Sequence, residues 1–288
     1  MNITNNSYNL INFFSKLNCN RPTNITNITN ITNITNITNI TNNIFNQFFK
    51  HIIDGNNEIE KHKLKEKTQF YNRQYKSINT KTIPKPKSFN DFSFPKDVLE
   101  NIHKLSVKLI SYSINIFDRH FNILFINDKQ QNTLKIYDTY VDNILVWLYI
   151  INIYADTKCS NTLTLYFYQT NLSKELPASN TETIDQIHAN TAFTRTCQTN
   201  GEIVIFRNEE WFKVFLHETM HKFGLDFSGI NSNFCTKHML SLFHVESDVN
   251  LYESYTEFWA RTINVLFCSY NYIKQNTGIK GTLTDYNK

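Results

Sequence analysis

Glycine and proline are both scarce in this chain, with 6 and 5 residues among 288. This scarcity disfavours glycine-rich loops for nucleotide phosphates, collagen-like repeats and proline-rich recognition segments. The chain also lacks a strong excess of basic residues, because its formal net charge is only +4. A dedicated nucleic-acid binder is expected to have a much larger excess, so that class is disfavoured as well.

Long apolar runs are missing too. The best candidate, ILVWLYII at residues 144–151, is far shorter than the ~20 residues needed to cross a bilayer. The N-terminus has neither the basic start nor the apolar run of a secretory signal. The five cysteines form no CxxC pair, which disfavours a disulfide framework or a four-cysteine zinc site. We therefore expect reduced thiols and an intracellular, cytoplasmic protein without a membrane segment.

What the chain does contain is enough apolar material for a core, with 41% hydrophobic, 14% aromatic and 19% charged residues. Its N-terminal part is different, because residues 24–43 repeat Asn-Ile-Thr. A period of three matches neither a helix face nor a strand face, which predicts disorder. An Asn-rich aggregating or adhesive segment is the alternative.

A lysine-rich stretch at residues 57–86 follows the repeat and is typical of a solvated linker. Weak electrostatic contact with nucleic acid or an acidic surface through this stretch stays open as an alternative. We place a domain boundary near Pro95. Residues 1–95 are then a low-complexity, largely disordered region, and residues 96–288 form the folded domain.

Beyond Pro95 the apolar spacing predicts helices and strands in mixed order, which indicates the α+β class. Strands are expected near 114–116, 121–125, 163–167 and 202–206, and helices near 98–109, 134–153, 209–223 and 251–270. The third of these helices has Asn208 as its expected N-cap and Gly224 just past its end.

This third helix contains an HExxH motif, residues 217–221. Residues four apart lie on one helix face with about 6 Å between their Cβ atoms, so both imidazoles can bind one ion. Zinc accepts neutral imidazole nitrogens, and catalytic zinc sites use three protein ligands and leave one position for water. We therefore expect His217 and His221 to bind one Zn²⁺ ion, with Glu218 as the general base beside it.

The chemistry that this arrangement predicts is hydrolysis of peptide bonds. The metal lowers the pKa of its bound water to about 7, and Glu218 removes a proton and later passes it to the leaving amine. The alternative is a surface helix whose histidines only cap or pack. Four aromatic residues on the helix oppose this alternative, because a buried helix would leave the imidazoles and the carboxylate unsatisfied. These aromatic residues are Trp211, Phe212, Phe215 and Phe223.

The motif and its surroundings resemble the zincin metallopeptidases over about residues 190–260. The uncharged positions of the extended zincin motif are filled here by Val214, Thr219, Met220 and Phe223. Lys222 departs from the motif, since that position is usually uncharged, and we expect its side chain to extend to solvent. The resemblance implies a zincin-like fold, in which a mixed sheet and an active-site helix precede a helical C-terminal part.

The third ligand distinguishes the branches of this family. Metzincins place it three residues after Gly224, where this chain has Phe227, while Asp226 is one residue out of register and remains a candidate. Gluzincins take a glutamate from a later helix, and residues 252–260 (YESYTEFWA) look like that element. The resemblance implies Glu253 as the ligand and Glu257 as the hydrogen-bond acceptor that fixes the tautomer of His217. The reverse assignment stays open, as does a solvated helix face with two acids.

Weaker candidates remain as well. Possible ligands or hydrogen-bond donors at the site are His238, His244, Tyr252, Tyr255, Cys197 and Cys235. Residues Asn190, Thr191, Ala192 and Phe193 resemble the edge strand by which zincins bind an extended peptide, and a plain loop is the alternative.

The sequence thus predicts a zinc-dependent, gluzincin-like peptidase acting on a peptide or protein substrate. The alternative is a catalytically inactive binding or structural protein with a zincin fold. Residues 202–227 also resemble a segment of zincin-like proteins from large DNA viruses. That resemblance implies the host cytoplasm or the virion as the location, and a virion or host-interaction component as the inactive alternative.

Overall fold

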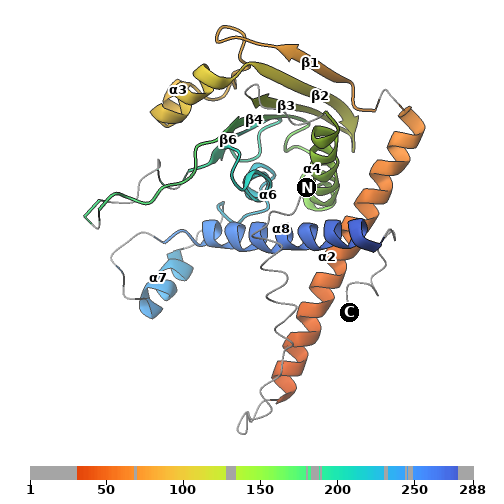
Figure 1. The fold of residues 1–288 in the computed structure, drawn as a ribbon. Coiled ribbons are helices and arrows are strands. Elements are labelled where there is room, and N and C mark those ends of the chain that lie inside the picture. Colours follow the sequence, from red (N-terminus) through yellow and green to blue (C-terminus); the bar gives the residue numbers. More distant parts are fainter. Residues whose placement is uncertain are drawn as a thin grey trace.

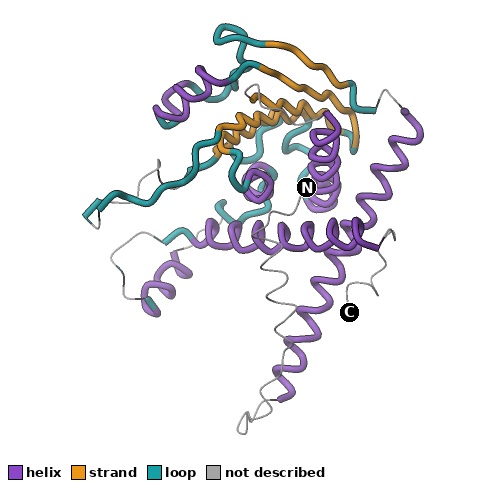
Figure 2. The backbone as a smooth tube through the Cα atoms, viewed as in Figure 1, coloured by secondary structure: helices purple, strands orange, loops and turns teal. Residues whose placement is uncertain are grey.

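A computed structural model describes residues 31–277 except 68–69, 128–133, 180, 183–187, 189, 230–232, 244 and 246–248. The described chain forms a mixed sheet of six strands with helices packed against it (Figure 1; Figure 2). The mixed helix-and-strand class predicted from the sequence is confirmed. None of the described helices has the length and apolar character needed to cross a membrane.

The strand order in the sheet is β1-β2-β3-β4-β6-β5. The strands are β1 (Arg73–Ser77), β2 (Lys108–Ile116), β3 (Arg119–Asn127), β4 (Thr162–Thr170), β5 (Ala192–Thr194) and β6 (Asn200–Arg207). The first three are antiparallel, whereas β3, β4 and β6 run parallel to one another. β5 is antiparallel to β6 and forms one edge of the sheet.

Six helices are described besides the sheet. They are α2 (Ile31–Glu66), α3 (Lys96–Leu105), α4 (Leu134–Tyr154), α6 (Trp211–Lys222), α7 (Asn233–Leu242) and α8 (Leu251–Thr277), with a 3-10 turn η2 (Asp91–Ser93). α4 makes the crossover between the parallel strands β3 and β4. The four helices expected beyond Pro95 are present, whereas α2, β1 and α7 were not predicted.

Alternation along the strands divides the buried side chains between the two faces of the sheet. On β4, Leu163, Leu165 and Phe167 belong to the larger core, which also contains residues of α2, α4, α6 and α8. Tyr166 and Tyr168 belong to the smaller core under α3. The helix with the HExxH motif therefore lies on the more heavily covered face.

The expectation of disorder up to Pro95 is wrong for the described part of that region. Ile52 and Ile59 of α2 are at most 1% exposed and belong to the larger core. The ring centroids of Phe48 in α2 and Trp259 in α8 lie 5.5 Å apart. Residues 1–30, which include the first part of the Asn-Ile-Thr repeat, lie outside the described residues.

Ion pairs and hydrogen bonds also tie the lysine-rich stretch to the domain. Asp142 of α4 accepts from Lys63 Nζ and from the Tyr71 hydroxyl, each at 2.6 Å. Further along, the Glu202 carboxylate accepts from the backbone N–H of Lys87 at 2.9 Å and of Ser88 at 2.7 Å. The boundary expected near Pro95 is therefore not a boundary of the fold.

Candidate metal centre and active site

Helix α6, which contains the HExxH motif, is held by packing on its apolar side. Phe212, Phe215 and Leu216 are at most 1% exposed and belong to the larger core. Trp147 of α4 donates from Nε1 to the Thr219 hydroxyl at 2.6 Å, with both groups buried. Because these contacts fix how the helix is rotated, they also fix the face on which its histidines lie.

The start of α6 differs from the prediction. Asn208 was expected to cap the helix, but Glu210 occupies the N-cap position with a left-handed φ of 52° and no side-chain capping bond. The backbone N–H of Asn208 instead donates to the carbonyl of Thr170 at 3.0 Å. At Asn208 the chain is therefore still hydrogen-bonded to the end of β4. The helix begins only after the chain has left the sheet.

The end of α6 follows the prediction. Gly224 adopts φ 65°, a left-handed conformation that glycine accepts without steric cost. The backbone N–H of Leu225 donates to the carbonyl of Met220 at 2.8 Å, which is the bond that closes a Schellman motif. This reversal of the chain brings Asp226 back to the ring of His221.

Lys222 was expected to reach solvent, and this expectation is wrong. Its side chain is fully buried, and its Nζ donates to the carbonyl of Arg195 at 2.9 Å and to Gln198 Oε1 at 3.4 Å. Burial lowers the pKa of the ammonium group to about 8. A Cβ atom at position 201 would lie 2.3 Å from Lys222 Cε, so Gly201 makes the room for this side chain.

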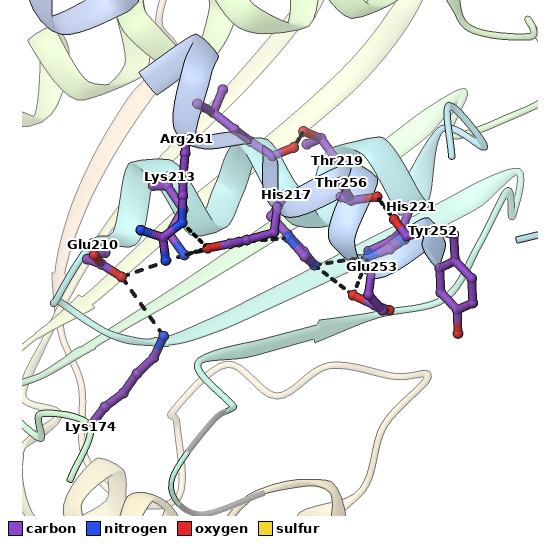
Figure 3. Close-up of polar contacts among 12 residues, drawn as sticks. Lys174, Glu210, Lys213, His217, Thr219, His221, Tyr252, Glu253, Thr256 and Arg261 are labelled. Atoms are coloured by element: carbon purple, nitrogen blue, oxygen red, sulfur yellow. Dashed lines mark hydrogen bonds and ion pairs between the residues drawn. The ribbon is translucent and has the colours of Figure 1, made fainter. Parts of the chain in front are cut away.

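The second acidic element lies on α8, which packs along α6. Thr256 and Ala260 are fully buried on this helix, and Phe267 stacks edge to face on Phe212 with centroids 5.2 Å apart. The packing aims Glu253 at the histidine face of α6 (Figure 3), and the Glu257 carboxylate lies 3.3 Å from His217 Nδ1 on the same face.

Three potential metal ligands meet between these helices. His217 Nε2 and His221 Nε2 lie 3.0 Å apart, and Glu253 Oε2 lies 3.3 Å from the first and 3.4 Å from the second (Figure 3). The structure thus brings together the three residues that the sequence predicted as ligands. That they bind zinc remains a prediction.

The spacing of these three atoms fits a tetrahedral zinc site. With bonds of about 2.0–2.1 Å, two ligands of a tetrahedral ion lie about 3.3–3.4 Å apart. The two distances to Glu253 have this value, and the distance between the imidazoles is slightly shorter. Two imidazoles and one carboxylate are also the donor set of known catalytic zinc sites.

The other ring nitrogens of the two histidines face acids, as expected for metal ligands. His221 Nδ1 is hydrogen-bonded to Asp226 Oδ2. His217 Nδ1 is buried and lies 3.3 Å from the Glu257 carboxylate, an ion-pair distance without standard hydrogen-bond geometry. Glu257 and Asp226 are therefore placed to orient the rings rather than to join the three ligand atoms.

Sequence reasoning missed Lys213 in this network. Its side chain is 9% exposed, and its Nζ lies 3.1 Å from Glu257 Oε1 and 3.6 Å from Glu210 Oε2. Arg261 Nε donates to the same Glu257 oxygen at 2.7 Å. These two cations hold the Glu257 carboxylate beside His217. The sequence could have indicated this role, because Lys213 lies four residues before His217 and shares its helix face.

The acids keep His217 protonated when no metal is bound. Burial alone would lower its pKa, but the contacts with Glu253 and Glu257 raise it to about 9. The hydrogen bonds from His217 and His221 in turn lower the pKa of Glu253 to about 2. The cluster therefore attracts positive charge between the two helices, which is the condition for binding a cation.

Glu218 lines a cleft of about 470 Å³ together with His217 and Glu253. Burial raises the pKa of its carboxyl group to about 7, a value suited to a general base at neutral pH. The same cleft is lined by Asn190, Thr191 and Ala192, so the predicted edge-strand segment borders the site. Phe193 does not, because it packs in the smaller core on the other face of the sheet.

The weaker candidates lie elsewhere. Tyr252 packs against the His221 ring, but its hydroxyl points away from the three ligand atoms (Figure 3). Tyr255 stacks on Phe227, and neither tyrosine lines the cleft. His238 is exposed on α7, Cys235 is exposed as well, and His244 lies outside the described residues.

The cysteines differ from the expectation of reduced thiols. Cys159 and Cys197 form a disulfide, with their Cα atoms 4.5 Å apart and a sequence separation of 38. Cys197 is therefore not a thiolate ligand. Cys235 and Cys268 are free among the described residues.

No comparison supplies an identity for this arrangement. The chain matches no family model, and neither the curated proteins nor the solved structures contain a match to it.

Proposed function

We propose that this protein is a zinc-dependent peptidase of the gluzincin type. The observation that supports this most strongly is the meeting of His217 Nε2, His221 Nε2 and Glu253 Oε2 within 3.4 Å of one another. Glu218 lies in the same cleft, and the other nitrogen of each histidine faces an acid. Two histidines that only cap or pack a surface helix would need neither a neighbouring carboxylate in a cleft nor an acid beside each second ring nitrogen.

A zinc ion held by these three residues would act as a Lewis acid toward water and the peptide carbonyl. Glu218 would accept a proton from the attacking water and deliver it to the leaving amine. Burial raises its pKa to about 7 in the metal-free protein, and the positive charge of a bound zinc ion would favour the carboxylate form that accepts a proton. Glu257 and Asp226 would keep the imidazoles in the tautomer and orientation that binding requires.

The edge of the sheet supplies a place for the substrate backbone. Among the described strands β5 pairs only with β6, and Ala192 of β5 lines the cleft together with Asn190 and Thr191 just before it. An extended peptide could add to this edge by main-chain hydrogen bonds, which would place its carbonyl groups beside Glu218.

The full-length protein loaded with one equivalent of zinc should cleave members of a diverse peptide library. A chelator should abolish the cleavage, and added zinc should restore it. A zinc-loaded protein that cleaves no peptide would contradict the proposal and support a binding or structural role for the same site.

Metal binding should also depend on pH. His217 has a pKa of about 9 in the metal-free protein, so zinc must displace its proton at any pH below that value. Because the pKa of His221 is raised as well, the apparent zinc affinity should rise at least about tenfold per unit between about pH 6 and about pH 8. Competition with a chromophoric chelator measures this, and an affinity that stays constant over the range would show that His217 is not a ligand.

A further inference from the structure

We infer that Lys174 binds a carboxylate of the peptide substrate about three residues from the bond that is cleaved. This inference rests on the proposed function and adds a substrate class to it. It concerns a residue outside the metal centre, in the segment that follows β4.

Lys174 is held at the cleft by its backbone. Its N–H donates to Glu209 Oε2 at 3.0 Å, which fixes the segment against the start of α6. Its side chain lines the same cleft as His217 and Glu218, and its Nζ points toward Glu210 (Figure 3). Because the anchor is a backbone group, it remains when the side chain is changed.

The other charged groups that line the cleft have close partners of opposite charge. Glu253 contacts both histidines, and Glu257 contacts Arg261 at 2.7 Å and Lys213 at 3.1 Å. Glu218 is the exception, and it is the proposed general base. The lining carboxylates of Glu253 and Glu257 thus belong to the metal centre or to its support.

The ammonium group of Lys174 is less well compensated. Its ion pair, with Glu210 Oε2, is long at 3.9 Å, and Glu210 also contacts Lys213 at 3.6 Å. Partial burial and the nearby charge of Lys213 lower the pKa of Lys174, although Glu210, Glu257 and Glu209 oppose this. A substrate carboxylate would supply the close anionic partner that the protein does not provide.

Glu210, the ion-pair partner of Lys174, gives the scale of the distance between Lys174 and the reacting bond. Glu210 precedes His217 by seven residues, which corresponds to about 10 Å along a helix axis. An extended peptide advances about 3.3 Å per residue, so this distance spans about three residues. The carboxylate can belong to an acidic side chain or to the C-terminus of the peptide, since a lysine binds either as a point charge.

The test compares matched peptides on the full-length, zinc-loaded protein. Each of the three residues on either side of a cleaved bond is set to Glu, Gln or Lys, and each peptide is made as a free acid and as a C-terminal amide. At one position we expect kcat/KM to be at least about tenfold higher for Glu than for Gln. If the free acid is preferred instead, the chain end is the source of the carboxylate.

Lys174→Glu should reverse this preference toward Lys, and Lys174→Arg should retain it. Lys158→Glu is the matched control, because Lys158 is exposed and outside the cleft. The inference would be overturned if the wild type showed no preference for the acidic peptides. It would also be overturned if Lys174→Glu preferred them as strongly as the wild type does.

A measurement of peptide binding, which does not require cleavage, tests the role of Lys174 separately from the proposed peptidase activity. The same peptides, labelled for fluorescence anisotropy, are titrated against the zinc-loaded Glu218→Gln variant and its double variant with Lys174→Glu. Acid-selective binding that the second change removes supports the role of Lys174 even if the wild type cleaves nothing, in which case only the peptidase proposal fails. Binding without such selectivity contradicts the role of Lys174 and leaves the peptidase proposal standing wherever cleavage is seen.

Discussion

Glu218→Gln is expected to keep one zinc ion per chain while lowering kcat/KM by at least about 100-fold. The amide has nearly the shape of the carboxylate but cannot accept a proton at neutral pH. Because Glu218 lines the cleft without belonging to the three ligand atoms, its loss should leave the metal in place. Zinc content and the hydrolysis rate of a library-derived peptide measure the two effects separately.

Glu100→Gln is the matched control for this substitution, since Glu100 is an exposed residue of α3 on the other side of the sheet. It should leave both zinc content and turnover unchanged. If Glu218→Gln turns over peptides as fast as the wild type, Glu218 takes no part in the chemistry. If this variant loses its zinc, Glu218 is a metal ligand.

The second large effect concerns the two glutamates of α8. Glu253→Ala should lower zinc affinity more than Glu257→Ala, because Glu253 contacts the Nε2 atoms of both histidines, whereas Glu257 contacts Nδ1 of His217. For Glu257→Ala we expect the ~10–100-fold loss typical of an orienting contact. Competition with a chelator of known affinity measures both losses.

The order of the two losses decides between the two assignments of these glutamates. A larger loss in Glu257→Ala would favour the reverse assignment. Stoichiometric zinc in the double variant would mean that neither glutamate is a ligand. The Glu253 side chain is 46% exposed, so a circular dichroism spectrum like that of the wild type should confirm that its removal leaves the fold intact.

The part of the site that local geometry determines could be predicted from the sequence. His217 and His221 share a helix face whatever the rest of the fold does, and the same holds for Glu253 and Glu257. The convergence of the two pairs required only that two apolar helices pack together. Gly224 was likewise predictable, because a glycine at that position is a local signal for the end of a helix.

What failed depends on contacts between residues far apart in the chain. Lys222 is buried because a loop containing Arg195 and Gln198 offers oxygens to its ammonium group, and nothing near Lys222 in the sequence indicates this. Cys159 and Cys197 pair across 38 residues without a CxxC spacing. Lys174 reaches the cleft from a segment whose position is set by its contact with Glu209.

The N-terminal error has a different cause. The triplet repeat gives no helical period, but the apolar residues that follow it do recur at helical spacing. These residues are Phe45, Phe48, Phe49, Ile52 and Ile59. The prediction that residues 1–95 are low-complexity and largely disordered did not take this helical spacing into account. The strand β1 is five exposed residues long, and only its pairing with β2 defines it.

The most direct test of the whole account is the zinc content of the full-length protein, purified beside His221→Ala and His238→Ala. His221 is a proposed ligand, and His238 is an exposed histidine on α7 that serves as the matched control. We expect about one zinc ion per chain in the wild type and in His238→Ala, and none in His221→Ala. A wild type without zinc, or a His221→Ala variant with as much as the wild type, would contradict it.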